Sequence, residues 1–193
     1  MVDIVEHLEQ FLGPITAGWS KDADGNQQHA QILKFSEGAN GGIASYATLG
    51  LSHRKLGLPD KEPVRIELLM MVRKGIFERY VPSLMQQLVG DLIHGGTAPL
   101  RGEVIGPRGR IDPDTCLEAF FVYNPVYLPD EFGTYKDTDG PVLIVWLIPL
   151  FREEASFAQT KGGEALAGLL LEYDPDLTDW RRPPLPIHSS RNG

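Results

Sequence analysis

Residues 64–72 read VRIELLMMV, and this stretch decides the class of fold. Its even-numbered positions are all apolar, whereas the odd-numbered positions open with Arg65 and Glu67 before they also become apolar. Alternation of this kind is typical of a strand that packs one face on a core. The polar start of the other face places one end of the strand near solvent. The sequence therefore predicts a strand whose apolar face belongs to the core.

The clearest helix follows at residues 82–94. Between Val81 and Ile93, apolar residues recur at i, i+3, i+4, i+7, i+8, i+11 and i+12, which is an unbroken stripe along one helix face. Pro82 suits the first turn of a helix, and Gly95-Gly96 can supply the left-handed residue that ends it. We expect this helix to lie on a sheet or on another helix.

The remaining elements are predicted from the same periodicities and from glycine and proline stops. They are a helix over 4–12, a hairpin of 32–35 and 43–51 around Asn40-Gly41, strands at 103–105 and 117–123, and one or two helices over 153–173 with a break at Gly162-Gly163 and an inward stripe of Leu166, Leu169, Leu170 and Tyr173. Residues 142–148 are apolar without alternation, which indicates a central strand buried on both faces. Residues 174–193 contain four prolines and are expected to form an extended tail.

These elements predict an α/β chain of the mixed α+β kind, with a mostly antiparallel or mixed central β-sheet covered by helices. A length of 193 residues fits a single domain and gives a core that needs no disulfide or metal. We expect that core to include Leu68, Met70, Leu88, Leu92 and Val145.

Composition excludes several classes of protein. The single cysteine, Cys116, cannot form an internal disulfide, which favours a reducing, cytoplasmic location. The acidic N-terminus does not resemble a signal peptide, and the longest apolar run, residues 142–151, is far shorter than the ~20 residues of a membrane span. A net charge of −8 disfavours nucleic-acid binding, which depends on basic side chains that neutralise phosphates.

The charge is unevenly distributed along the chain. Residues 53–110 carry ten basic and six acidic side chains, whereas residues 111–193 carry six basic and fourteen acidic ones. The candidate partner-binding residues lie where acids cluster beside a tryptophan: Glu172, Asp174, Asp176, Asp179 and Trp180. Aromatic residues often anchor interfaces while surrounding charges set the association rate. The alternative is that Trp180 packs the tail onto the body and the acids form a solvated face.

No reactive constellation is evident. The five histidines are scattered, and the Asp22–Leu33 segment departs from a calcium loop at its glycine and glutamate positions. The glycines at 38–42 precede a strand rather than a helix and lack a phosphate loop's lysine. Ser52 and His53 are adjacent, and on an extended chain they would point to opposite faces. We therefore expect no catalytic residues, no metal and no cofactor.

Two alternatives to a protein-binding role stay open. One is an enzyme whose site is assembled from distant segments of the chain. The other is an anion or small-ligand binder that uses the Arg101–Arg110 region, where residues 106–110 read GPRGR.

Several segments together resemble the Suppressor of fused domain. Residues 42–52, GIASYATLGLS, are similar to its T-x-G-L-S strand, and RIELL at 65–69 is similar to the strand that follows. Later similarities are IPL at 148–150, Glu153-Glu154, GEAL at 163–166 and an acidic segment from Asp176 that closes at Arg181. The resemblance spans residues 5–184. It implies a domain over 1–184, with 185–193 as an extended C-terminal tail.

The resemblance implies a mixed α/β fold, no catalysis and a protein partner. Animal members of the family bind a zinc-finger transcription factor of the Hedgehog pathway and carry a second domain, for which this chain is too short, so that role is not carried over. Single-domain bacterial members have been proposed as immunity proteins that neutralise toxins. We therefore expect a cytoplasmic binding protein whose partner is another protein, with a basic toxin domain as one candidate. The sequence leaves its oligomeric state open.

Overall fold

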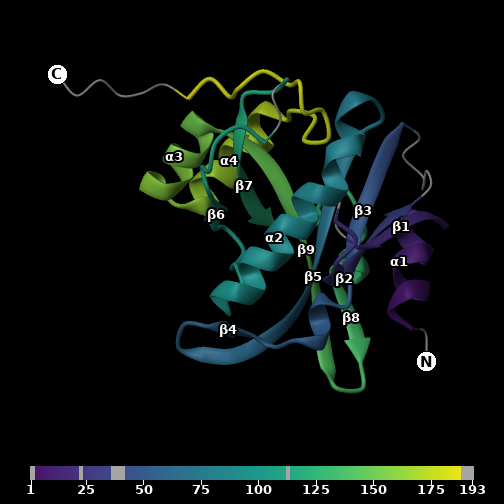
Figure 1. The fold of residues 1–193 in the computed structure, drawn as a ribbon. Coiled ribbons are helices and arrows are strands. Elements are labelled where there is room, and N and C mark those ends of the chain that lie inside the picture. Colours follow the sequence, from purple (N-terminus) through teal and green to yellow (C-terminus); the bar gives the residue numbers. More distant parts are fainter. Residues whose placement is uncertain (1–2, 22–23, 36–41, 112–113, 188–193) are drawn as a thin grey trace.

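The computed structural model describes residues 3–21, 24–35, 42–111 and 114–187. Figure 1 shows the arrangement of the elements in this part of the chain. Four helices are present in it: α1 (Ile4–Leu12), α2 (Val81–Gly95), α3 (Arg152–Lys161) and α4 (Gly163–Tyr173). The strands are β1 (Ile15–Lys21), β2 (Gln27–Phe35), β3 (Ile43–Leu49), β4 (Leu56–Leu58), β5 (Lys61–Arg73), β6 (Val104–Ile105), β7 (Leu117–Tyr123), β8 (Thr134–Asp137) and β9 (Gly140–Phe151). Short 3₁₀ helices are η1 (Leu51–His53), η2 (Ile76–Tyr80) and η3 (Asp130–Gly133).

The strands form one mixed sheet. Its order is β1-β2-β3-β5-β9-β7-β6, with β4 paired to β5 and β8 paired to β9. The two long central strands, β5 and β9, run parallel from the pair Arg65–Val142 to the pair Leu69–Trp146, whereas the other pairings are antiparallel. The predicted fold class, a mixed sheet covered by helices, is confirmed.

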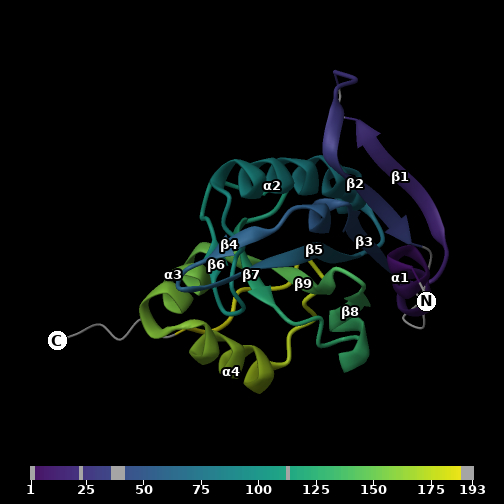
Figure 2. The same cartoon turned by 90° about the horizontal axis from the view of Figure 1, so that it is seen from below.

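Helices cover both faces of the sheet (Figure 2). One face packs against α2, and the other packs against α3, α4 and α1. Because side chains of a strand alternate between the faces, β5 supplies both cores. Its even-numbered residues from Ile66 to Val72 lie in the α2 core, and Leu69 and Met71 lie in the core under α3 and α4.

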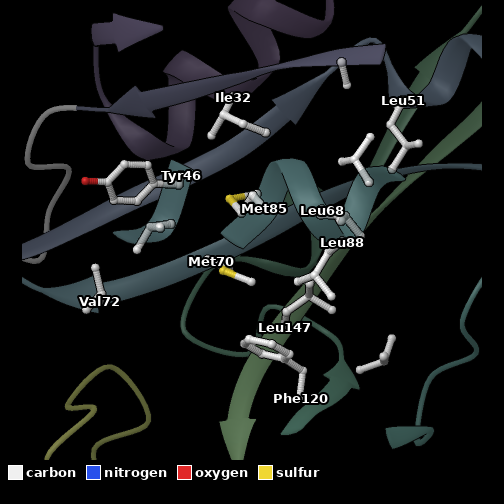
Figure 3. Packing of buried hydrophobic residues seen from close by; sticks show 14 of the residues in the cluster. Ile32, Tyr46, Leu51, Leu68, Met70, Val72, Met85, Leu88, Phe120 and Leu147 are labelled. Carbon is white, nitrogen blue, oxygen red and sulfur yellow. The ribbon is translucent and has the colours of Figure 1, made fainter. Parts of the chain in front are cut away.

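The α2 core contains the apolar stripe that the sequence predicts. Figure 3 shows Met85 and Leu88 of α2 facing Leu68 and Met70 of β5 and Leu147 of β9. The helix ends at Gly95, and the capping residue Gly96 has a φ of 67°, the left-handed conformation expected of a C-terminal glycine. The predicted helix and its inward face are confirmed.

Most of the other predicted elements are also confirmed. The helix at 4–12, the pairing of β2 with β3, the strand at 117–123 and two helices separated at Gly162 are all present. The predicted Asn40-Gly41 turn lies outside the described residues. The sequence did not predict β1, β4 or β8, and β2 begins at Gln27, five residues before the predicted strand at 32–35. This first part of β2 is polar because alternate residues of β2 face solvent.

Burial differs from the prediction at three kinds of position. Leu68, Met70 and Leu88 are buried, but Leu92 and Val145 are only partly buried at the edge of the α2 core. Leu143, in the half of β9 that was expected to be buried on both faces, is 37% exposed. Tyr173 of the predicted inward stripe, the last residue of α4, is 45% exposed.

Replacement of Leu88 by alanine should lower the free energy of unfolding by about 2–5 kcal/mol, since Leu88 is 5% exposed between α2 and the sheet. Denaturant unfolding measures this change. Gln87→Ala is the matched control, because Gln87 is exposed on the same turn and should change stability by less than about 0.5 kcal/mol. Equal unfolding midpoints for the two variants would contradict the packing of α2.

Candidate protein-binding surface

The TLGLS segment, residues 48–52, surrounds a buried carboxylate. Glu67 of β5 is fully buried, and its Oε1 accepts hydrogen bonds from the Gly50 amide at 2.9 Å, the Ser52 amide at 3.1 Å and the Ser52 hydroxyl at 2.7 Å. Its Oε2 accepts from the Thr48 hydroxyl at 2.5 Å, and that hydroxyl oxygen accepts from the Leu68 amide at 2.8 Å. The backbone pairing of β3 with β5 runs as far as the pair Ala47–Leu69. Beyond this pair, the hydrogen bonds of Thr48 and Ser52 to Glu67 connect the two segments.

The position of Glu67 corrects the sequence interpretation. The polar start of this strand face was read as an end near solvent, but the carboxyl group is inside the protein. Burial raises the pKa of Glu67 above its ordinary value of 4.5, and the hydrogen bonds from Thr48 and Ser52 offset only part of that shift. The one sequence signal for this buried carboxylate was a glutamate within an apolar strand. Its four hydrogen-bond donors lie 15 to 19 residues away along the chain, so no local pattern includes them.

Arg65 links the same turn to the neighbouring hairpin. Its Nε donates to the Ser52 carbonyl at 2.8 Å, and its guanidinium lies 2.7 Å from the Asp137 carboxylate of β8. The Arg65 guanidinium holds the pKa of Asp137 below its ordinary value of 3.8. Ser52 and His53 were expected to lie on an extended chain. They lie instead in the 3₁₀ helix η1, where the Ser52 hydroxyl donates a hydrogen bond to Glu67.

The later family-like segments meet at a second buried carboxylate. Glu154 of α3 is fully buried and forms a two-pronged ion pair with Arg182, with both N–O distances at 2.7 Å. Glu154 also accepts from the backbone amides of Phe151 and Leu185, and Arg182 also donates to the Pro149 carbonyl at 3.2 Å. The sequence analysis ended the acidic segment at Arg181. The arginine that pairs with Glu154 is its neighbour, Arg182.

These two clusters link segments that lie far apart in the sequence. Each buried carboxylate has both oxygens engaged by donors of the protein itself. The second cluster also explains why the segment after α4 is not a loose tail: Leu177, Trp180 and Leu185 are buried, and Arg182 ties the segment to α3. The predicted extended segment from Asp174 is therefore packed against the body over its described residues, which end at Ile187.

The acidic candidates do not form one uniform cluster. Glu172 and Asp174 are exposed at the end of α4. Asp176 pairs with Arg73 at 2.5 Å and accepts from the Thr178 hydroxyl at 2.6 Å. Burial would raise the pKa of Asp176, but the hydrogen bonds from Thr178 and Arg73 outweigh it and hold the pKa below its ordinary value. Asp179 is half-buried, and its side chain accepts from the Arg181 amide at 2.9 Å.

Trp180 lies inside the α2 core. It is 2% exposed, and its ring stacks on Phe77 at a centroid distance of 6.0 Å. This position fits the alternative that the tryptophan packs the C-terminal segment onto the body. The exposed acids that remain beside the end of α4 are Glu172 and Asp174.

An apolar groove runs beside these two acids. It has a volume of about 520 Å³ and lies between α4 and the loop after β7, with Ile148 and Leu177 among its lining residues. Its α4 wall presents Glu164, Gly168 and Leu171, which share one helix face by their spacing. Leu171 is 84% exposed. We call this feature the α4 groove.

A second groove of about 530 Å³ lies where β5, β8 and β9 meet the loop after β7, with Leu143 and Val145 among its lining residues. Val126, which is 55% exposed, lines both grooves. Three exposed apolar side chains of the described surface therefore lie around this loop. Val126 is on the loop itself, and Leu143 and Leu171 are on either side of it. Concentrated exposed apolar surface is a mark of interaction sites.

Two arginines of the alternative ligand site, Arg101 and Arg108, already have carboxylate partners. Arg101 lies 3.3 Å from Glu164 and donates to the Tyr123 hydroxyl at 2.9 Å, and Arg108 pairs with Asp91. Arg110 lines a small groove of about 120 Å³ together with Arg108 and Asp91. Arg101 does not line this groove, so Arg101, Arg108 and Arg110 do not converge on one site.

Within the described residues, histidine, cysteine and acidic side chains do not gather in groups of three or more that could hold a metal ion. Cys116 is exposed and unpaired. The helices in this part of the chain are too short or too polar to cross a membrane.

A mixed sheet covered on both faces by helices defines an α+β domain. The family model described as Suppressor of fused protein (SUFU) matches residues 26–183. The chain belongs to the Suppressor of fused family.

Solved structures agree with this assignment of the fold. The chain is similar to a SUFU homolog from Neisseria gonorrhoeae, with a TM-score of 0.72, 17% identity, and coverage of 93% of this chain and 92% of that one. It is also similar to a chain of the Sufu-Fu complex, with a TM-score of 0.70, 15% identity, and coverage of 93% and 89%. Drosophila Suppressor of Fused matches with a TM-score of 0.71 and 16% identity, over 94% of this chain and 50% of that one. Comparison with curated protein sequences finds no match.

Proposed function

We propose that this protein is a non-catalytic, cytoplasmic binding domain that acts by occupying a surface of another protein. The observation that carries the proposal is the pairing of exposed acids, Glu172 and Asp174, with the apolar α4 groove. A structure of one family member is described as a complex, Sufu with Fu, which supports a protein as the partner. The full engagement of the buried carboxylates Glu67 and Glu154 by the protein's own donors supports a role without catalysis.

The finer proposal is that the partner is a basic toxin domain and that the protein is an immunity protein. A net charge of −8 and exposed acids at the end of α4 would attract such a partner over distance, because steering by charge raises association rates more than it slows dissociation. Cross-linking and purification of the tagged protein from its native cells, followed by mass spectrometry, identifies the partner. A basic toxin whose activity is inhibited by the protein would support the proposal, and capture of a partner without such activity would contradict the immunity role.

Removal of two charges should slow association with that partner. In the variant Glu172→Gln/Asp174→Asn, both side chains keep their shape, and asparagine tolerates the left-handed φ of 43° at Asp174. Because charge steering is screened over about 8–10 Å at physiological salt, we expect a several-fold slower association at low salt, little change in dissociation, and a smaller difference at high salt. Surface plasmon resonance at two salt concentrations measures both rates.

Asp60→Asn/Glu62→Gln is the matched control. It removes the same two charges, and Asp60 also has a left-handed φ, of 54°. Both residues are exposed on the β4–β5 hairpin, which lies apart from α4 in Figure 1. A control that slows association as much as the α4 variant would show that net charge alone acts, and would contradict the assignment of this surface.

A further inference from the structure

The α4 groove has fixed walls. Tyr127 accepts a hydrogen bond from the Leu177 amide at 3.2 Å and donates to the Pro175 carbonyl at 3.3 Å, which joins the loop after β7 to the segment after α4. On the same wall, Arg101 lies 4.7 Å above the Tyr123 ring, and this ring stacks on Phe121 at 5.1 Å. A groove whose walls are already held in place loses little freedom when a ligand enters it.

The floor and the α4 wall are open to an apolar side chain. A Cβ at Gly168 would meet no other atom within 4 Å, so the helix surface is recessed at this position. Leu171 stands beside it with 84% of its surface exposed. A volume of about 520 Å³ lies in the range of about 300–1,000 Å³ that is usual for pockets that bury a ligand.

The rim of the groove is acidic. Glu164 and Asp174 line it, and Glu172 is exposed next to Leu171. Arg101 is the cation at this rim, and it lies 3.3 Å from Glu164. The two lining carboxylates, with Glu172 exposed beside them, outnumber the Arg101 guanidinium and leave a negative surplus around an apolar recess, which complements a segment that carries apolar and basic residues together.

We infer that the α4 groove binds a segment of a partner protein in which one or two large apolar residues are flanked by lysine or arginine. The apolar residues would lie over Gly168 against Leu171, and the basic residues would face Glu172 and Asp174. This inference rests on the proposed protein-binding function and adds the position and the chemistry of the contact.

The test uses the full-length protein and a phage-displayed library of short random peptides. We expect the selected sequences to combine large apolar residues with lysine or arginine. Fluorescence polarisation of a synthetic selected peptide should then show an affinity loss of at least about tenfold for Leu171→Asp and for Gly168→Leu, which remove or fill the apolar contact. Gly90→Leu is the control, because Gly90 also lies inside a helix with open space around it, and its affinity should equal that of the wild type.

Three outcomes would overturn the inference: selection of acidic or purely polar sequences, equal binding by wild type and both groove variants, or self-association of the wild type that Leu171→Asp abolishes. The last outcome would assign the groove to a second copy of this chain. If the natural partner binds Leu171→Asp normally, the groove inference fails while the protein-binding function stands. If cross-linking yields no protein partner, the proposed function itself fails.

Discussion

Arg182→Leu is expected to lower the free energy of unfolding by about 3–5 kcal/mol, because it leaves the carboxylate of Glu154 buried without its cation. The loss is a large part of the total stability of about 5–15 kcal/mol that is usual for a domain. Two backbone carbonyls, those of Pro149 and Pro183, also lose a donor. Urea unfolding followed by circular dichroism measures the change.

Arg181→Leu is the matched control for this prediction. Arg181 is the neighbouring arginine, but it is exposed and lies over the Phe77 ring at 5.3 Å, so its loss should cost about 1 kcal/mol or less. The double variant Glu154→Leu/Arg182→Leu should be more stable than Arg182→Leu, since it removes the unpaired charge as well. Similar stabilities for the two single arginine variants would contradict the structural role of the Glu154–Arg182 pair.

Glu67→Ala should cost about 3–5 kcal/mol. It leaves up to four donors from residues 48–52 without an acceptor, and each buried unsatisfied group costs about 1–3 kcal/mol. Glu67→Gln keeps one carbonyl oxygen for the Gly50 and Ser52 donors and should therefore cost less. Unfolding midpoints of the two variants, compared with the wild type, test this order. An alanine variant as stable as the glutamine variant would show that the hydrogen bonds contribute little.

The wild type and the variant Glu67→Gln together test the titration of Glu67. Its pKa in the folded protein is raised above the ordinary value of 4.5, so the folded state binds the proton more tightly than the unfolded state. The stability that this group contributes is fully present below pH 4.5 and is lost as the pH rises through the folded pKa. Relative to Glu67→Gln, the wild type should therefore gain stability as the pH falls through this window. A difference that is constant with pH would contradict the raised pKa.

The sequence by itself determined the elements whose signals are local. The alternation in 64–72 and the stripe from Val81 to Ile93 specify β5 and α2, because a strand or helix repeats its contacts at a fixed spacing. The glycine at 162 separates α3 from α4 for the same local reason. The order of the motifs was enough to indicate the family.

Only the tertiary structure decided the environment of individual side chains. Glu67 is polar in sequence but buried, because residues 48–52 fold over it and supply its donors. Trp180 stands in an acidic segment but packs on Phe77, because Arg182 anchors that segment to Glu154. Leu171 belongs to an apolar stretch but is exposed on the wall of a groove that α4 forms with the loop after β7. Burial depends on which distant segments arrive at a residue, and no local repeat carries that information.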